Sequence, residues 1–106
     1  MVLFKSSDRT WLPLPQGTGV SLFPLRPNGQ GGGSALLRFE PGAKFPAHDH
    51  PGGEEVYVVE GSVRIGDKEL QTGDYLWTPP GGIHDAQTET GCVLFLSAPE
   101  GIKVVE

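Results

Sequence analysis

The three histidines of the chain fall into one pattern that is typical of metal sites. His48 and His50 are two residues apart, and a carboxylate, Glu54, follows four residues after the second histidine. Successive side chains of a strand point to opposite faces, so His48 and His50 point to the same side. His84 follows a Pro-Pro-Gly-Gly turn that sets the direction in which the third imidazole approaches. The pattern predicts a metal site built from these four side chains.

Two adjacent glutamates compete for the fourth position. Glu54 shares the parity of the two histidines, whereas Glu55 faces the other side if the alternation holds. Residues 51–53 read Pro-Gly-Gly and form a loop, and that loop must reset the phase for Glu55 to serve instead. The alternation favours Glu54 and leaves Glu55 as the alternative.

Three neutral imidazoles and one carboxylate suit a borderline divalent ion. Iron, zinc, manganese, nickel and copper are all compatible with these ligand types, whereas calcium and magnesium prefer oxygen ligands. Four ligands either close a tetrahedral structural zinc site or leave two positions of an octahedron open for chemistry. The residue types do not choose between these arrangements, and they identify no catalytic residue beyond the metal ligands.

The elements that must position these residues are short β-strands. The chain has 16 glycines and 10 prolines, and they punctuate β-branched runs at regular intervals, which indicates an all-β sandwich or barrel. No segment keeps a helical period over three turns. The expected strands are 19–25, 34–40, 54–60, 63–65, 68–71, 75–78 and 92–96, with further strands ending at His50, containing His84, and at 103–105. Turns are expected at Pro41–Gly42, Gly61–Ser62 and Gly66–Asp67.

Length and composition exclude several classes of protein. A length of 106 residues predicts one domain that spans residues 1–106. The net charge is −5 and the eight basic residues are scattered, so nucleic-acid binding is not expected. No apolar run approaches the roughly 20 residues of a membrane helix, and the N-terminus lacks the apolar core of a signal peptide. One cysteine, Cys92, excludes an internal disulfide, and a cytoplasmic location is expected.

The chain resembles the cupins, a family of small β-barrels with two signature motifs. The first motif, at 42–61, is glycine, five residues, His-x-His, three or four residues, glutamate, six residues and glycine, met by Gly42, His48, His50, Glu54 and Gly61. The second motif, at 73–88, is met by Gly73, Pro79, Gly81 and His84. Thr88 stands where that motif has asparagine. A narrower resemblance, over most of residues 10–97, is to the ChrR-like cupins.

The resemblance implies a jelly-roll barrel (a double-stranded β-helix) with little or no helix, and a metal held inside by His48, His50, Glu54 and His84. It also implies a small-molecule ligand or substrate in the barrel and a homodimer. ChrR-like cupins include domains of anti-sigma factors and oxygenases that cleave β-diketones or hydroxyacetophenones. Binding of a sigma factor by the former uses a separate helical zinc domain. The diketone-cleaving type usually has three histidines without the glutamate, so neither property is carried over to this chain.

Three functions remain open. The first is a mononuclear non-haem metal enzyme, most simply an iron-type dioxygenase of a small carbonyl or phenolic compound, with Fe2+ as the expected metal and Mn2+ or Ni2+ also compatible. The second is a non-catalytic domain that binds Zn2+ and senses a small molecule or redox state. The third is a purely structural metal site.

Further residues are candidates for the mouth of the barrel, with an ordinary surface position as the alternative: Arg38, Tyr57, Arg64, Trp77 and Gln87. Asp49 and Asp85 each neighbour a histidine, and strand alternation turns them away from it. Cys92 is expected to be a buried core thiol.

Overall fold

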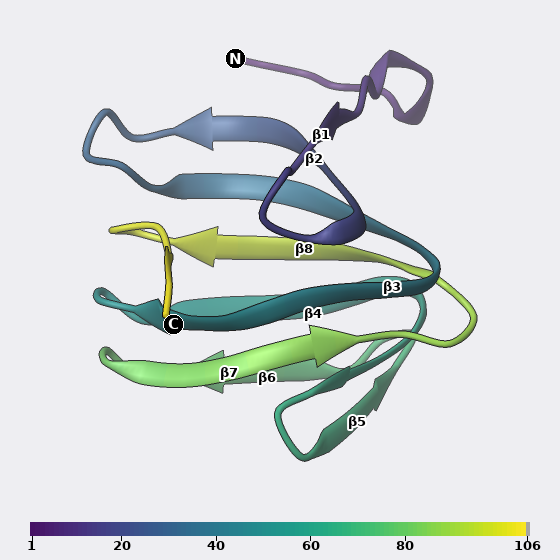
Figure 1. The fold of residues 1–106 in the computed structure, drawn as a ribbon. Coiled ribbons are helices and arrows are strands. Elements are labelled where there is room, and N and C mark those ends of the chain that lie inside the picture. Colours follow the sequence, from purple (N-terminus) through teal and green to yellow (C-terminus); the bar gives the residue numbers. More distant parts are fainter. Residues whose placement is uncertain (106) are drawn as a thin grey trace.

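The computed structural model describes residues 1–105, which form nine β-strands and one short 3-10 helix (Figure 1). The elements are η1 (Ser6–Asp8), β1 (Leu12–Pro13), β2 (Thr18–Pro27), β3 (Gly33–His50), β4 (Glu54–Ile65), β5 (Lys68–Gln71), β6 (Tyr75–Thr78), β7 (Gly82–Gln87), β8 (Cys92–Ala98) and β9 (Lys103–Val104). All paired strands run antiparallel. The predicted all-β class is confirmed. No helix within residues 1–105 is long and apolar enough to cross a membrane.

Hydrogen-bonded pairing closes the strands into a barrel. Strand β8 pairs with both β3 and β4, and β7 also pairs with both of them. The ring β3-β8-β4-β7 therefore returns to its starting strand, and closure of this kind removes the unpaired edges that an open sheet would expose. Strands β2, β5, β6 and β9 extend the ring at its sides.

The two longest strands differ from the expected division into shorter ones. β3 continues through Pro41–Gly42 and β4 continues through Gly61–Ser62, where turns were expected. Before these points β3 and β4 both pair with β8, and after them both pair with β7. Gly42 and Gly61 have φ angles of +82° and +89°, so each glycine bends its strand from one partner to the other without ending it. The expectation of two turns was wrong for this reason.

The other short elements agree with the sequence. β4 and β5 form the expected hairpin around Gly66–Asp67, with Ile65 opposite Lys68. The segment around Leu12–Pro13 lies at the edge of the sheet, as its prolines require. The N-terminal arm packs aromatic rings over the outer face of β2, where Phe4 meets Phe23 at 5.2 Å between ring centroids.

The core lies inside the ring. Its side chains alternate with exposed ones along β4, where Val56 and Val58 are buried and Glu55 and Tyr57 are exposed. This alternation sets which face of each strand can carry a buried site.

Candidate metal centre

The ends of three strands bring the four predicted ligands together inside the barrel. β3 ends with His48 and His50, β4 begins with Glu54, and β7 carries His84 directly opposite His48. One ring nitrogen from each histidine lies within 4.8 Å of one from each of the others, an arrangement that could hold a metal ion. Glu54 Oε1 lies 3.3 Å from His50 Nε2 and 3.6 Å from His84 Nε2.

The turn after His50 sets the orientation of Glu54. The backbone N–H of Gly53 donates to the carbonyl of His50 at 3.0 Å, and Gly53 has a φ of +82°. The chain therefore enters β4 with Glu54 inward, where it is 5% exposed. Glu55 points outward and accepts a hydrogen bond from the Tyr75 hydroxyl at 3.0 Å. The geometry thus brings Glu54, and not Glu55, to the histidines.

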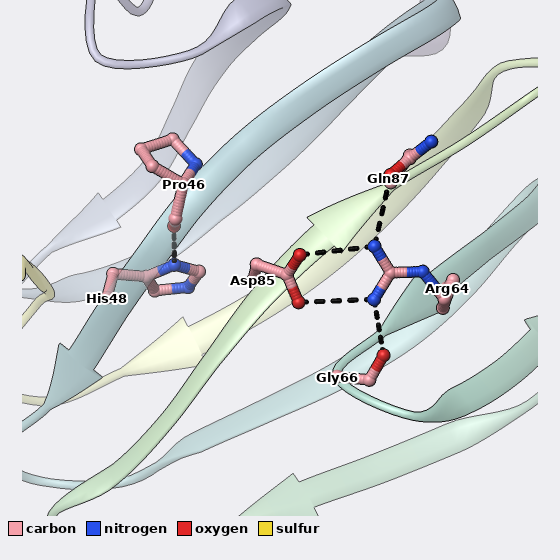
Figure 2. Close-up of polar contacts among 6 residues, drawn as sticks. All are labelled: Pro46, His48, Arg64, Gly66, Asp85 and Gln87. Atoms are coloured by element: carbon pink, nitrogen blue, oxygen red, sulfur yellow. Dashed lines mark hydrogen bonds and ion pairs between the residues drawn. The ribbon is translucent and has the colours of Figure 1, made fainter.

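Two backbone carbonyls set the tautomers of two imidazoles. The Nδ1 of His48 lies 2.7 Å from the carbonyl oxygen of Pro46 (Figure 2), and the Nδ1 of His50 lies 2.7 Å from that of Gly82. A carbonyl only accepts, so in both rings Nδ1 carries the proton and donates. In the neutral ring Nε2 then keeps its lone pair, which is the form that binds a metal.

The Nε2 atom of His50 supplies a direct test of fit to a metal. It is buried and has no hydrogen-bond partner among the described residues, although Glu54 Oε1 lies 3.3 Å away. Buried polar atoms are rarely left without a partner, so this one calls for an explanation. Ligand atoms around one metal at about 2.0–2.1 Å lie about 3.0–3.4 Å apart. The Glu54 separations of 3.3 and 3.6 Å are close to that range, so the residues fit a bound cation.

The electrostatics of the centre also favour a cation. Burial alone would raise the pKa of Glu54, but the neighbouring imidazoles of His50 and His84, at 3.3 and 3.6 Å, outweigh burial and lower that pKa to about 2. Burial alone would lower the pKa of His50, but the Glu54 carboxylate outweighs it and the pKa is raised. Burial lowers the pKa of His48. At neutral pH the centre therefore holds one buried carboxylate that attracts positive charge.

A cavity of about 410 Å³ opens beside this centre. His48, Glu54 and His84 form part of its wall, whereas His50 does not and is 0% exposed. Most of the remaining wall is apolar and includes Leu14, Leu22, Leu37, Phe39, Val56 and Leu96. Among the described residues, no lysine or arginine lines it, and the uncharged polar side chains are Gln16 and Ser34.

None of the five candidates for the mouth of the barrel lines this cavity, and Gln87 lines a second opening together with His84 and Phe45. Tyr57 and Trp77 are exposed on the outer face, at 46% and 57%. The Arg38 guanidinium lies 4.7 Å from the centre of the Trp11 ring. Arg64 bonds to Gln87 at 3.1 Å outside the cavity.

Three further residues lie in or near the motifs, and for Cys92 and Asp85 the sequence made a prediction. Cys92 is buried in the apolar core, as expected. Asp85 faces away from the histidines and binds Arg64. Thr88, in place of the motif's asparagine, is buried; its hydroxyl donates to the carbonyl of Ser62 at 2.6 Å and accepts from the backbone N–H of Gly91 at 2.9 Å. This position therefore fastens a turn and does not contact the metal centre.

Sequence reasoning missed the cavity wall that comes from outside the two motifs. Leu14 and Gln16 reach the cavity from the segment between β1 and β2, and Gly101 and Ile102 reach it from the segment after β8. Nothing local to the sequence indicated that these two segments meet at the cavity.

An antiparallel barrel with a His-x-His, glutamate and histidine cluster inside it defines a cupin. The sequence model of the ChrR Cupin-like domain matches residues 1–100, and the chain belongs to that family.

Known proteins share the fold over most of the chain. An acetylacetone dioxygenase from Acinetobacter johnsonii superposes with a TM-score of 0.85 at 15% identity, over 100% of this chain and 78% of that one. A chain from the Rhodobacter sphaeroides complex of SigE with the anti-sigma ChrR has a TM-score of 0.72 at 22% identity, over 89% of this chain and 50% of that one. At these identities the likeness shows the fold alone.

One curated relative matches by sequence. The DNA damage-repair/toleration protein DRT102 of Arabidopsis thaliana is 31% identical over 70 residues, which cover 60% of this chain and 23% of that protein. The chain thus spans less than a quarter of the curated relative that it matches.

Proposed function

We propose that the chain holds one divalent transition metal through His48, His50, Glu54 and His84, and that it is a dioxygenase of a small carbonyl or phenolic compound. When bound, an iron-type metal would supply Lewis acidity and reactivity toward O2. Zinc suits the same ligands, and manganese and nickel are compatible with them. The buried Nε2 of His50, which has no hydrogen-bond partner, supports the metal.

The cavity of about 410 Å³ supports the proposal that a small molecule reaches the metal, as opposed to a purely structural metal site. A structural site needs four ligands and no adjacent space, whereas ligand pockets in proteins run from about 300 to 1,000 Å³. His50 lies behind the cavity wall while His48, Glu54 and His84 reach it. Substrate would therefore approach the metal from the cavity side, opposite His50.

The composition of the wall limits the substrate. Apolar side chains and the absence of lysine and arginine among the described lining residues disfavour phosphates and sugars. With three neutral histidines, the Glu54 carboxylate leaves a divalent ion with one net positive charge. A substrate that binds through one anionic oxygen, as an enolate or phenolate does, neutralises that charge. The apolar remainder of the molecule would pack against the leucines of the wall.

A domain that binds zinc and senses a small ligand is the second candidate. The same cavity supports it, because ligand binding needs the space as much as turnover does. The likeness to a chain of the SigE–ChrR complex, at a TM-score of 0.72, supports it at the level of the fold. A homodimer and a cytoplasmic location stay predictions.

The test is oxygen consumption by protein loaded separately with iron, manganese, nickel or zinc. The protein is incubated under 18O2 with a panel of β-dicarbonyl and hydroxyacetophenone compounds, and the masses of the products are measured by mass spectrometry. We expect oxygen consumption with a redox-active metal and no oxygen consumption with zinc. Both atoms of O2 should appear in the cleaved products. Ligand-induced thermal stabilisation of every loaded form without oxygen consumption would instead support the sensor.

A further inference from the structure

His84 differs from the other two histidines in how its ring is held. His48 and His50 each donate an Nδ1–H to a backbone carbonyl, at 2.7 Å in both cases. No hydrogen bond of this kind reaches the His84 ring from the described residues, and Glu54 Oε1 lies 3.6 Å from its Nε2. The position of this imidazole therefore depends on the backbone of β7.

The β7 backbone is weakly held on the side of β4. Pairing between the two strands is limited to Arg64 with Gln87 and Ile65 with Ala86. β4 then turns at Gly66 into the β5 hairpin, and its last backbone contact with β7 is the N–H of Gly66 donating to the carbonyl of Asp85 at 2.9 Å. His84 is the next residue along, at the point where this support ends.

On the outer face, the Arg64 side chain links β4 to β7 beyond the point where their backbone pairing ends (Figure 2). Its Nη1 and Nη2 each donate to one carboxylate oxygen of Asp85 at 3.1 Å, and Nη2 also donates to Gln87 Oε1 at 3.1 Å. Nη1 donates as well to the carbonyl of Gly66, in the turn itself. One guanidinium thus ties the β4–β5 turn to two side chains of β7.

The faces of β7 connect this clamp to the site. Asp85 and Gln87 point outward, whereas His84 and Ala86 point inward. The turn lies beside the base of the His84 side chain, because a Cβ built on Gly66 would lie 3.6 Å from the Cβ of His84. Fixing the outward side chain of Asp85 therefore fixes the rotation of the strand that turns His84 inward.

We infer that Arg64 is a positioning residue for His84, holding β7 through Asp85 so that the third imidazole meets the metal. This inference rests on the proposed metal centre. The planar fork of a guanidinium can bind both oxygens of one carboxylate while reaching two further acceptors, whereas a lysine ammonium is a single point charge. Charge alone is therefore not enough for the role.

The test is the affinity of the full chain for Co2+, measured by competition with a coloured chelator, together with the visible spectrum of the bound ion. The variants are Arg64→Met, Arg64→Lys and Asp85→Asn. The matched control is Arg38→Met. Arg38 also pairs with a carboxylate, because its Nε lies 3.4 Å from Glu40 Oε1, but it does not line the cavity. The melting temperature of each metal-free protein reports any general loss of stability.

Arg64→Met is expected to weaken Co2+ binding about 10- to 100-fold, as loss of an outer partner does at other metal sites, and to change the spectrum. Arg64→Lys should not restore either property, and Arg38→Met should leave both unchanged even if it melts earlier. If Arg64→Met keeps the wild-type affinity and spectrum, the inference is overturned. If Arg64→Met does not fold, Asp85→Asn takes its place, and wild-type affinity and spectrum in that variant overturn the inference. A wild-type chain that binds no Co2+ would instead contradict the metal centre itself.

Discussion

Glu54 Oε1 lies 3.3 Å from Nε2 of His50, and both side chains are almost completely buried. Neither could be placed there by one strand alone, because His50 ends β3 and Glu54 begins β4. The intervening turn reverses the chain while keeping both residues on the inner face. A proton or a cation must lie near this contact, since a buried carboxylate is costly without a positive partner.

Metal affinity is expected to fall as the pH falls, because protons compete for the imidazoles. The lowered pKa of Glu54, about 2, removes the carboxylate from this competition above pH 4. His50 has a pKa raised above the ordinary 6.5 by Glu54, so the loss begins above pH 6.5. Affinity should fall by about tenfold per pH unit for each proton displaced. Chelator competition with Co2+ between pH 5 and 8 measures this, and a flat profile would contradict it.

The bend in β4 predicts that replacing Gly61 by alanine destabilises the protein more than the same change at Gly73. A Cβ on Gly61 would lie 2.3 Å from the carbonyl oxygen of Gly91, and the φ of Gly61 is +89°. Gly73 has a similar φ of +90°, but a Cβ there would meet nothing within 4 Å. Gly73→Ala should therefore cost about 1–2 kcal/mol for the left-handed backbone alone. Gly61→Ala should cost about 3–5 kcal/mol, because steric overlap is added to that strain.

Urea denaturation of the two alanine variants separates these contributions. Equal losses of the free energy of unfolding would show that β4 and β8 can move apart at Gly61, contrary to the closed ring.

Cys92 is expected to be inert in the folded protein. Burial raises the pKa of its thiol to about 12, from an ordinary value of 9.0. The thiolate is the reactive form, so a thiol reagent at pH 8 should label the folded chain far more slowly than the unfolded chain. Because the unfolded thiol ionises first, its contribution to stability is complete below pH 9 and is lost as the pH rises toward 12. Labelling in native buffer as fast as in denaturant would show that Cys92 is accessible.

Parity and spacing predicted the local part of the site. Strand alternation predicted that His48 and His50 share a face, and the same parity favoured Glu54. Glu54 begins the next strand, however, so it is the turn through Gly53 that brings it to that face. The turn signals at Gly42 and Gly61 were misleading, because a glycine with a positive φ suits both a turn and a bend within a strand. Which of the two forms depends on β7 and β8, whose pairing is set by the whole barrel.

Contacts between segments that are distant in the chain could not be predicted from the sequence. Asp85 was expected to face away from the metal, and it does, but its partner Arg64 is 21 residues earlier in the chain. No local pattern joins these two residues, because the contact exists only once the β4–β5 turn lies against β7. The cavity wall contributed by Leu14 and Gln16 is hidden from the sequence for the same reason.

The metal content of the purified protein tests the proposed four-ligand centre. Wild type, His84→Ala, Glu54→Ala and Glu55→Ala are purified without added metal and measured by mass spectrometry of the elements. Glu55 is the matched control, since it is the adjacent glutamate and faces outward. We predict about one transition metal per chain in wild type and Glu55→Ala, and little or no metal in His84→Ala and Glu54→Ala, because loss of a ligand weakens binding at least about tenfold. Full metal content in Glu54→Ala and His84→Ala would contradict it.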